Sequence, residues 1–137
     1  MASLVYTSFL EDLAKANIDL DTATIKVALV DSSYTENKDT HTKRSDVSGE
    51  VSGTGYTAGG TTVTVTVTKD TTNDRLDISL GTVTWPTSTI TARKAVYYVS
   101  TGTASTDSLI AVNDFGTDKV TTAGTFTLNA STVRLQN

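Results

Sequence analysis

The stretch that decides the fold covers residues 61–80 and reads TTVTVTVTKDTTNDRLDISL. Its first half alternates strictly, which places the valines of 63–67 on one face of a predicted strand and the threonines on the other. Residues 70–74 are typical of a turn, and the alternation resumes over 76–80. The stretch therefore predicts a β-hairpin whose register is set by one apolar face.

Similar patterns recur along the rest of the chain. Residues 24–30, 125–128 and 132–135 alternate between apolar and polar positions. Residues 95–99 and 109–112 are apolar on both faces, as expected of central strands that are covered on two sides. The whole pattern of roughly seven or eight strands predicts an all-β fold, either a β-sandwich or a jelly-roll-like architecture.

One proline interrupts this pattern. Trp85 stands directly before Pro86, and a proline lacks the N–H that a strand ladder needs. Pro86 is therefore expected to mark the end of a strand, and Trp85 is expected to fill the core with its large apolar ring.

A short N-terminal helix is predicted at about residues 8–16. Ser8 and Glu11 have the spacing of a capping box, and Asn17 is expected to end the helix. The apolar stripe of this helix would consist of Phe9, Leu10, Leu13 and Ala16. Such a helix either closes one end of the β core, which we favour, or serves as a docking arm for a partner.

Composition limits the classes of function that the chain can serve. A length of 137 residues predicts one domain over 1–137, and the absence of cysteine excludes disulfides and thiolate chemistry. The formal net charge of −4 argues against nucleic acid as a partner. No apolar stretch is long enough for a membrane span, and the first residues do not resemble a secretory signal, so no membrane partner is expected. Threonine is unusually frequent, which favours sheet over helix.

The long polar segment at about residues 31–60 is the main candidate for an interaction loop. Serine, threonine, charged residues and glycine dominate it, and a connection of this length is usually functional. A charged and aromatic cluster inside it forms the candidate interface: Lys43, Arg44, Asp46 and Tyr56. An ordinary solvated loop is the equally weighted alternative.

The sequence offers no assembled catalytic, cofactor-binding or metal site. His41 is the only histidine and lies in a polar loop without a positioned partner. The carboxylates group at Asp19 and Asp21 and again within 70–77, where turn chemistry explains aspartate better than paired acid-base catalysis or calcium binding. We therefore expect no enzyme activity and no cofactor.

Several strings of residues are similar to a known family. They are TKRSDV at 42–47, GTGYTAGG at 53–60, VTW at 83–85, ITARKAVYY at 90–98, NDFG at 113–116 and STVRLQN at 131–137. The chain resembles, nearly end to end, the small virion structural proteins of tailed bacteriophages, which are usually encoded with head-assembly genes. The family supplies no catalytic residues.

The resemblance implies a bacteriophage virion structural protein, made in the cytoplasm of the bacterial host and located on the capsid surface. Its expected role is that of a capsid decoration or cement protein that binds the major capsid protein and stabilises the head. Self-association into a homo-oligomer, a dimer or a trimer, would multiply its contacts with the lattice. The alternatives are a tail or head-tail connector component, or the base of a head fibre or receptor-binding module.

Overall fold

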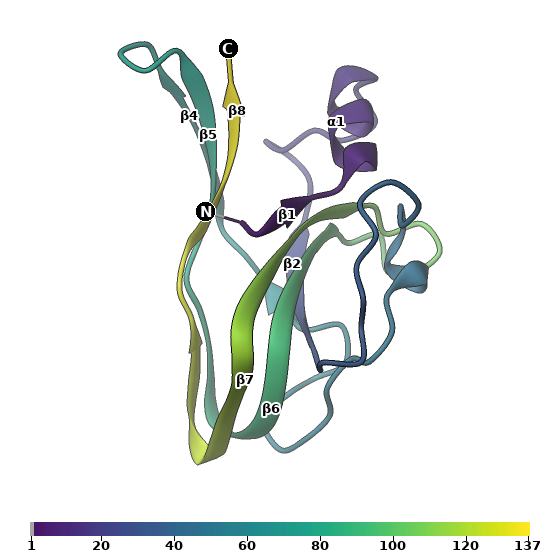
Figure 1. Ribbon diagram of the computed structural model, residues 1–137, viewed down its shortest axis with the longest axis vertical. Coiled ribbons are helices and arrows are strands. Elements are labelled where there is room, and N and C mark those ends of the chain that lie inside the picture. Colours follow the sequence, from purple (N-terminus) through teal and green to yellow (C-terminus); the bar gives the residue numbers. More distant parts are fainter. Residues whose placement is uncertain (1) are drawn as a thin grey trace.

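A computed structural model describes residues 2–137 as two antiparallel sheets and one short helix (Figure 1). The five-stranded sheet has the order β1-β7-β6-β2-β3. Its strands are β1 (Leu4–Val5), β2 (Ile25–Val30), β3 (Thr61–Thr62), β6 (Val83–Val99) and β7 (Leu109–Leu128). The three-stranded sheet has the order β4-β5-β8, with β4 (Val65–Asp70), β5 (Arg75–Leu80) and β8 (Ser131–Gln136). The predicted all-β, sandwich-like fold is confirmed.

Both sheets are built from one long antiparallel ribbon. Only residues 81–82 separate β5 from β6, and only residues 129–130 separate β7 from β8. The pairing stays in register across both joints, since Leu80 pairs with Ser131 and Val83 pairs with Leu128. Strands β5 and β6 therefore act as one edge of the ribbon, and β7 and β8 act as the other.

The ribbon doubles over at its middle, and this bend creates the two layers. The register between β6 and β7 shifts between Trp85 and Ser88. Within the bend Thr87 and Ala123 have positive φ values of 50° and 48°. Figure 1 shows the sharp return of β7 at the bottom of the view, after which the chain runs back up toward the C-terminus. The two arms then face each other and enclose the core.

The expectation that Pro86 ends a strand is wrong. Pro86 lies inside β6, at the bend, where the ladder is already interrupted by the register shift. Its missing N–H costs nothing there, because a proline is tolerated at such an irregularity. Trp85 is buried, as expected, and its ring meets Phe126 edge to face at a centroid distance of 5.9 Å.

Two apolar clusters cover both faces of the five-stranded sheet. The main cluster lies between the sheets and includes Ile25, Val27 and Leu29 of β2. The second cluster lies on the outer face and contains Tyr6, Ala28, Val30, Tyr34, Val96, Tyr98, Leu109 and Val112. The prediction of central strands covered on two sides is therefore confirmed. The segment between β2 and β3, residues 31–60, supplies much of the outer cover, including the buried Tyr34.

The predicted hairpin is present, with one change at its start. Val65 pairs with Leu80 and Val67 pairs with Ile78, which is the register set by the apolar face. The alternating stretch is divided, however, because Thr61–Thr62 pairs with β2 whereas Val65–Asp70 pairs with β5. Val63, between them, is buried in the core. The chain passes from one sheet to the other there and closes that side of the sandwich.

The helix α1 (Thr7–Ala14) is present near the predicted position, but its predicted ends are wrong. Tyr6 is the N-cap and makes no side-chain cap bond, and Ser8 lies inside the helix with a buried hydroxyl that has no hydrogen-bond partner. The helix ends before Asn17, with Lys15 as the C-cap. The backbone N–H of Thr7 is instead satisfied by the carbonyl of Lys38, so a tertiary contact replaces the capping box.

The predicted apolar stripe of α1 is only partly buried. Phe9 is fully buried and Leu13 is half-buried against the core, whereas Leu10 and Ala16 are exposed. The helix therefore packs on the sandwich through a narrower face than its sequence suggests. Within residues 2–137 no helix has the length and apolar character needed to cross a bilayer.

Candidate protein-binding site

The sequence-predicted interface residues are held by contacts inside the chain. The Arg44 Nε donates to Asp107 Oδ2 at 2.7 Å, and the guanidinium lies 5.0 Å from the centre of the Tyr98 ring. The Lys43 Nζ donates to the Ser108 hydroxyl at 2.7 Å. Both basic side chains thus attach the 31–60 segment to the loop that joins β6 and β7.

Asp46 and Tyr56 have structural roles as well. The Asp46 carboxylate accepts the backbone N–H groups of Thr42 and Lys43 at 2.9 and 3.0 Å, and these bonds lower its pKa. Burial raises the pKa of Tyr56, whose hydroxyl donates to Glu50 and accepts the N–H of Leu29. The four residues therefore do not form one free patch, and they fix the 31–60 segment on the sheet.

His41 ends a buried chain of hydrogen bonds. The hydroxyls of Tyr6 and Tyr34 are 2.7 Å apart, and the Tyr34 hydroxyl lies 3.0 Å from His41 Nδ1. Burial is the main cause that raises the pKa values of both tyrosines, so their hydroxyls stay protonated at neutral pH. The imidazole also stacks on the Tyr34 ring. This arrangement anchors the loop.

The aspartates are used as turn caps and cross-strand ion pairs. Asp19 accepts the N–H of Asp21, and Asp70 accepts the N–H groups of residues 72 and 73, which confirms the turn interpretation. Asp77 instead lies within β5 and pairs with Arg134 of β8 at 2.7 Å. In the described part of the chain, no group of three or more histidine, cysteine, aspartate or glutamate residues is arranged to hold a metal ion.

Three large apolar side chains stand out as exposed among residues 2–137. They are Leu10, Val67 and Val120, with exposed fractions of 44%, 42% and 64%. Val120 and Val67 each border a hollow in the surface, and Leu10 lies on α1 one turn before Leu13, which lines the same hollow as Val67. Exposed apolar groups gathered at a hollow are typical of a protein-binding surface.

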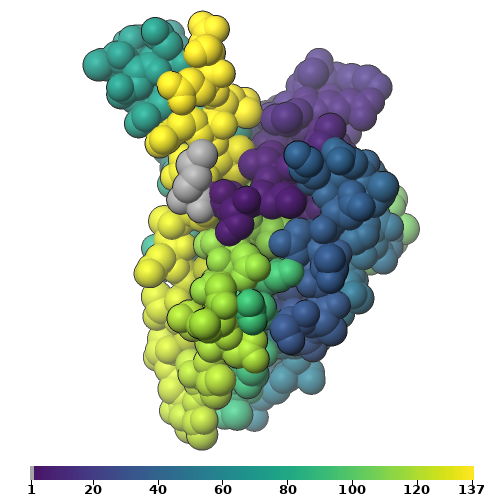
Figure 2. All heavy atoms as spheres, in the orientation of Figure 1, coloured from purple at the N-terminus to yellow at the C-terminus, as the bar shows by residue number. Residues whose placement is uncertain are grey.

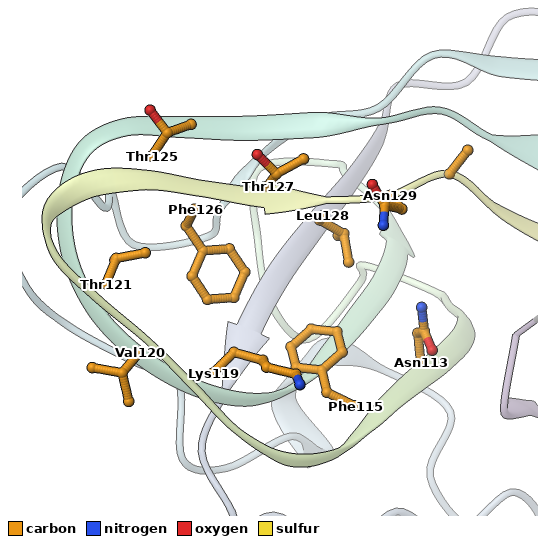
Figure 3. Close-up of a pocket in the computed structure, with 11 residues that line it drawn as sticks. Asn113, Phe115, Lys119, Val120, Thr121, Thr125, Phe126, Thr127, Leu128 and Asn129 are labelled. Atoms are coloured by element: carbon orange, nitrogen blue, oxygen red, sulfur yellow. The ribbon is translucent and has the colours of Figure 1, made fainter.

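The first hollow is a groove between the two arms of β7, which we call the β7 groove (Figure 3). Phe126 and Leu128 of the returning arm point toward Phe115 and Lys119 of the outgoing arm, and Val120 lies at the border. The rings of Phe115 and Phe126 are 6.2 Å apart between centroids. The groove has a volume of about 310 Å³. Its floor is apolar, and Lys119 is its one charged lining residue.

The β7 groove is bordered by free strand edge. The outer side of β7 pairs with β1 only at Ala111 and Val112, so within the described residues no strand neighbours that side from Asn113 onward. The edge is irregular between Asp114 and Lys119, because only one residue of β6 stands opposite the four residues 115–118. Such an edge offers unpaired backbone groups to an incoming segment, and its bulge limits which segment fits.

The second hollow separates α1 from the free ends of β4, β5 and β8, and we call it the notch. In Figure 2 it lies at the top, between the teal and yellow lobe of these strands and the purple lobe of α1. Val67 of β4 and Leu13, Ala16, Ile18 and Leu20 of the helical side line it. Its volume is about 410 Å³. The notch therefore has apolar groups on both walls.

Sequence reasoning did not find these hollows. Val120 is one apolar residue within the polar run GTDKVTTAGT, and this exception was the only local signal for the β7 groove. Val67 was expected on the buried face of its strand, but β4 is the edge strand of its sheet, and Val67 is exposed although its cross-strand partner Ile78 is buried. The chain matches no protein-family model, no curated protein and no solved structure.

Proposed function

We propose that the chain is a structural protein of a tailed-phage virion and that it works as a capsid decoration protein. It binds major capsid subunits and stabilises the assembled head. The single observation that carries the binding role is the β7 groove, which combines the exposed Val120 and the half-buried Phe115 with a free strand edge. The assignment to a virion comes from the family resemblance of the sequence strings.

The β7 groove suits an extended segment of another protein. An incoming strand can use the unpaired backbone of β7 for hydrogen bonds and place an apolar side chain against Val120 and Phe115. Lys119 at the border favours a carboxylate beside that side chain. We propose that a capsid subunit supplies this segment.

The rigid body of the protein supports such a role. The strings TKRSDV and GTGYTAGG lie in the 31–60 segment, where Arg44 and Tyr56 hold the loop against the sheet. A protein whose loops are already ordered loses little conformational entropy when it binds. Each bound copy then stabilises the capsid state that it prefers by mass action.

Fractionated virions test the position of the protein in the particle. Virions that carry this chain are disrupted to separate heads from tails, and the chain is quantified in each fraction by mass spectrometry. A decoration protein remains with the heads in hundreds of copies. Recovery with the tails, in a few to several dozen copies, would instead identify a tail or connector component and refute the proposal.

A substitution in the groove tests the binding surface. Val120→Asp places a charge on an exposed residue, so the fold is retained while binding of purified protein to undecorated heads falls by roughly tenfold or more. Ser105→Asp, which adds the same charge in the exposed loop between β6 and β7, is the matched control and binds normally. Equal binding of both variants would exclude the β7 groove as the contact.

A further inference from the structure

We propose that the notch is occupied by a second copy of this chain, in a two-fold dimer in which the strand ends of each copy enter the notch of the other. The partner of this surface is thus distinct from the capsid segment proposed for the β7 groove. The inference rests on the chemistry of the two notch walls and does not depend on the proposed function.

The first wall is the projecting end of the three-stranded sheet, here called the tip. On one face of the tip Lys69 pairs with Leu76, and Leu76 pairs with Leu135. Farther down the same face Val67 pairs with Ile78, which is buried. Leu76 and Leu135 are only half-buried, and a hollow of about 380 Å³ lies over them. The apolar face of the sheet thus continues past the point where the monomer covers it.

The second wall is formed by α1 and the turn that follows it, residues 15–21. Leu13, Ile18 and Leu20 contribute apolar surface, and Leu10 lies one turn before Leu13 on the same side of the helix. Asp19 and Asp21 line the same wall and are both exposed. The wall is therefore apolar at its base and acidic at its border.

The charges on the apolar face of the tip and on the helical wall are opposite in sign. Lys69 is the charged residue on that face, whereas the helical wall carries Asp19 and Asp21. Asp70 and Arg75, which pair with each other, and Asp74 also line the hollow over the tip. Among the described residues none of Lys69, Asp19 and Asp21 takes part in an ion pair within the molecule. A tip that enters the notch of another copy brings its lysine to that acidic border while its leucines cover the apolar base.

One chain carries both walls, and this favours a two-fold arrangement. In a dimer about a two-fold axis every contact between two different surfaces occurs twice, so both tips and both notches are covered at once. The pairing of tip with notch also gives attraction across the interface in spite of the formal charge of −4 on each copy. If the tip packed on the partner's tip instead, the two Lys69 side chains would lie near each other. Asp19 and Asp21 would then have no basic group opposite them.

Sedimentation velocity of the purified full-length protein at low salt is the first test. The wild-type chain is expected to be a dimer at micromolar concentration. Two variants with reversed charge, Lys69→Asp and the double variant Asp19→Lys with Asp21→Lys, each place like charges across the interface. Each is expected to weaken self-association by roughly tenfold or more, with an unchanged far-UV circular dichroism spectrum. Lys119→Asp, which reverses an exposed charge that lines the β7 groove and not the notch, is the matched control and should remain dimeric.

A mixture of the two variants separates the tip-to-notch arrangement from every other dimer. In the mixed dimer the acidic tip of one copy meets the basic notch of the other, and the basic tip of the second meets the acidic notch of the first. Both contacts are then attractive, so the mixture should recover the dimer that neither variant forms alone. Isotope labelling of one variant and native mass spectrometry identify the mixed dimer directly.

The proposal is overturned by any of three results. These are a monomeric wild-type protein at the concentrations tested, a dimer that both variants retain, or a mixture that does not recover dimer. Failure here is distinguishable from failure of the proposed function, because a strictly monomeric chain that still binds heads would refute only the dimer. A chain that dimerises through the notch but is absent from heads would refute only the capsid role.

Discussion

At the scale of single residues, the stability of this protein depends on positions where the 31–60 segment meets the sheet. Gly60 shows this most directly. It has a φ of +76°, and a Cβ added there would lie 1.7 Å from the carbonyl oxygen of Val27. Asp107 has a comparable role on the opposite side of the segment, where its side chain is 1% exposed and bonded to Arg44.

Gly60→Ala is expected to destabilise the protein by at least about 3 kcal/mol, because a backbone carbonyl cannot move away as a flexible side chain could. Gly116→Ala is the matched control, since Gly116 has nearly the same φ of +78° and no atom within 4 Å of the added Cβ. The control should lose only about 1–2 kcal/mol for the left-handed conformation. Urea unfolding measures both, and equal losses would show that the close approach to Val27 is unimportant.

Asp107 is expected to make stability depend on acid pH. Burial opposes its ionisation, but the N–H of Thr101 and the Arg44 guanidinium outweigh burial and lower its pKa. A carboxylate with a lowered pKa in the folded state stabilises the protein above its unfolded pKa of about 3.9, and this contribution is lost as pH falls through the folded value. Thermal unfolding should therefore show decreasing stability below about pH 4.

The variant Asp107→Asn separates this contribution from the other carboxylates. It should lose about 2 kcal/mol at neutral pH, because Arg44 loses its partner, and it should show a smaller decline in acid. Asp39→Asn, at an exposed carboxylate outside the notch, should behave as the wild type does. An acid profile of Asp107→Asn identical to that of the wild type would contradict the prediction.

At the scale of elements, the bend of the β6–β7 ribbon decides the architecture. Without it, β5 to β8 would form one extended hairpin with an unprotected apolar face. Thr87 and Ala123 adopt left-handed φ values at the bend, which are unfavourable for residues with a Cβ. The packing of the two arms, including Trp85 on Phe126, must therefore compensate for local strain.

Glycine at the bend is expected to relieve this strain. Thr87→Gly and Ala123→Gly should each stabilise the protein by about 0.5–1 kcal/mol in urea unfolding, since glycine adopts positive φ without a steric cost. The same change at Thr91, an exposed position in the regular part of β6, should destabilise it by a similar amount. Destabilisation by all three substitutions would show that the bend is unstrained.

At the scale of the whole molecule, the continuous ribbon links the two sheets. No element of the three-stranded sheet is independent, because β5 continues into β6 and β7 continues into β8. The core between the sheets joins residues of both, for example Ile78 and Leu80 with Val27 and Leu29. The molecule should therefore unfold as one unit.

Unfolding curves from two probes test whether the molecule unfolds as one unit. Trp85 fluorescence and far-UV circular dichroism should give the same midpoint in urea, since the indole reports the core and the dichroism reports the strands. Leu80→Ala should lower both midpoints together, with a loss of about 3 kcal/mol. Two separate transitions would show that the three-stranded sheet unfolds on its own.

The sequence by itself determined the strands β2, β4, β5 and β8 and the turn that closes the β4–β5 hairpin, but it indicated only short parts of β6 and β7 and wrongly placed Val67 on a buried face. These features depend on a period of two and on turn residues, both of which act over a few neighbouring positions. It also indicated the covered central strands, because apolar residues on both faces leave no solvent-facing side.

The tertiary structure alone decided the bend at Pro86, the order of the 31–60 segment and the two hollows. Each depends on residues far apart in the chain: Thr87 opposite Ala123, Arg44 on Asp107, and Val67 beside Leu13. A local sequence pattern shows that a side chain is apolar, but whether this side chain is buried depends on whether a distant segment packs over it. Val67 lies on the edge strand β4 and Val120 on the part of β7 that β1 does not reach, and both remain exposed because within the described residues no further strand covers those edges.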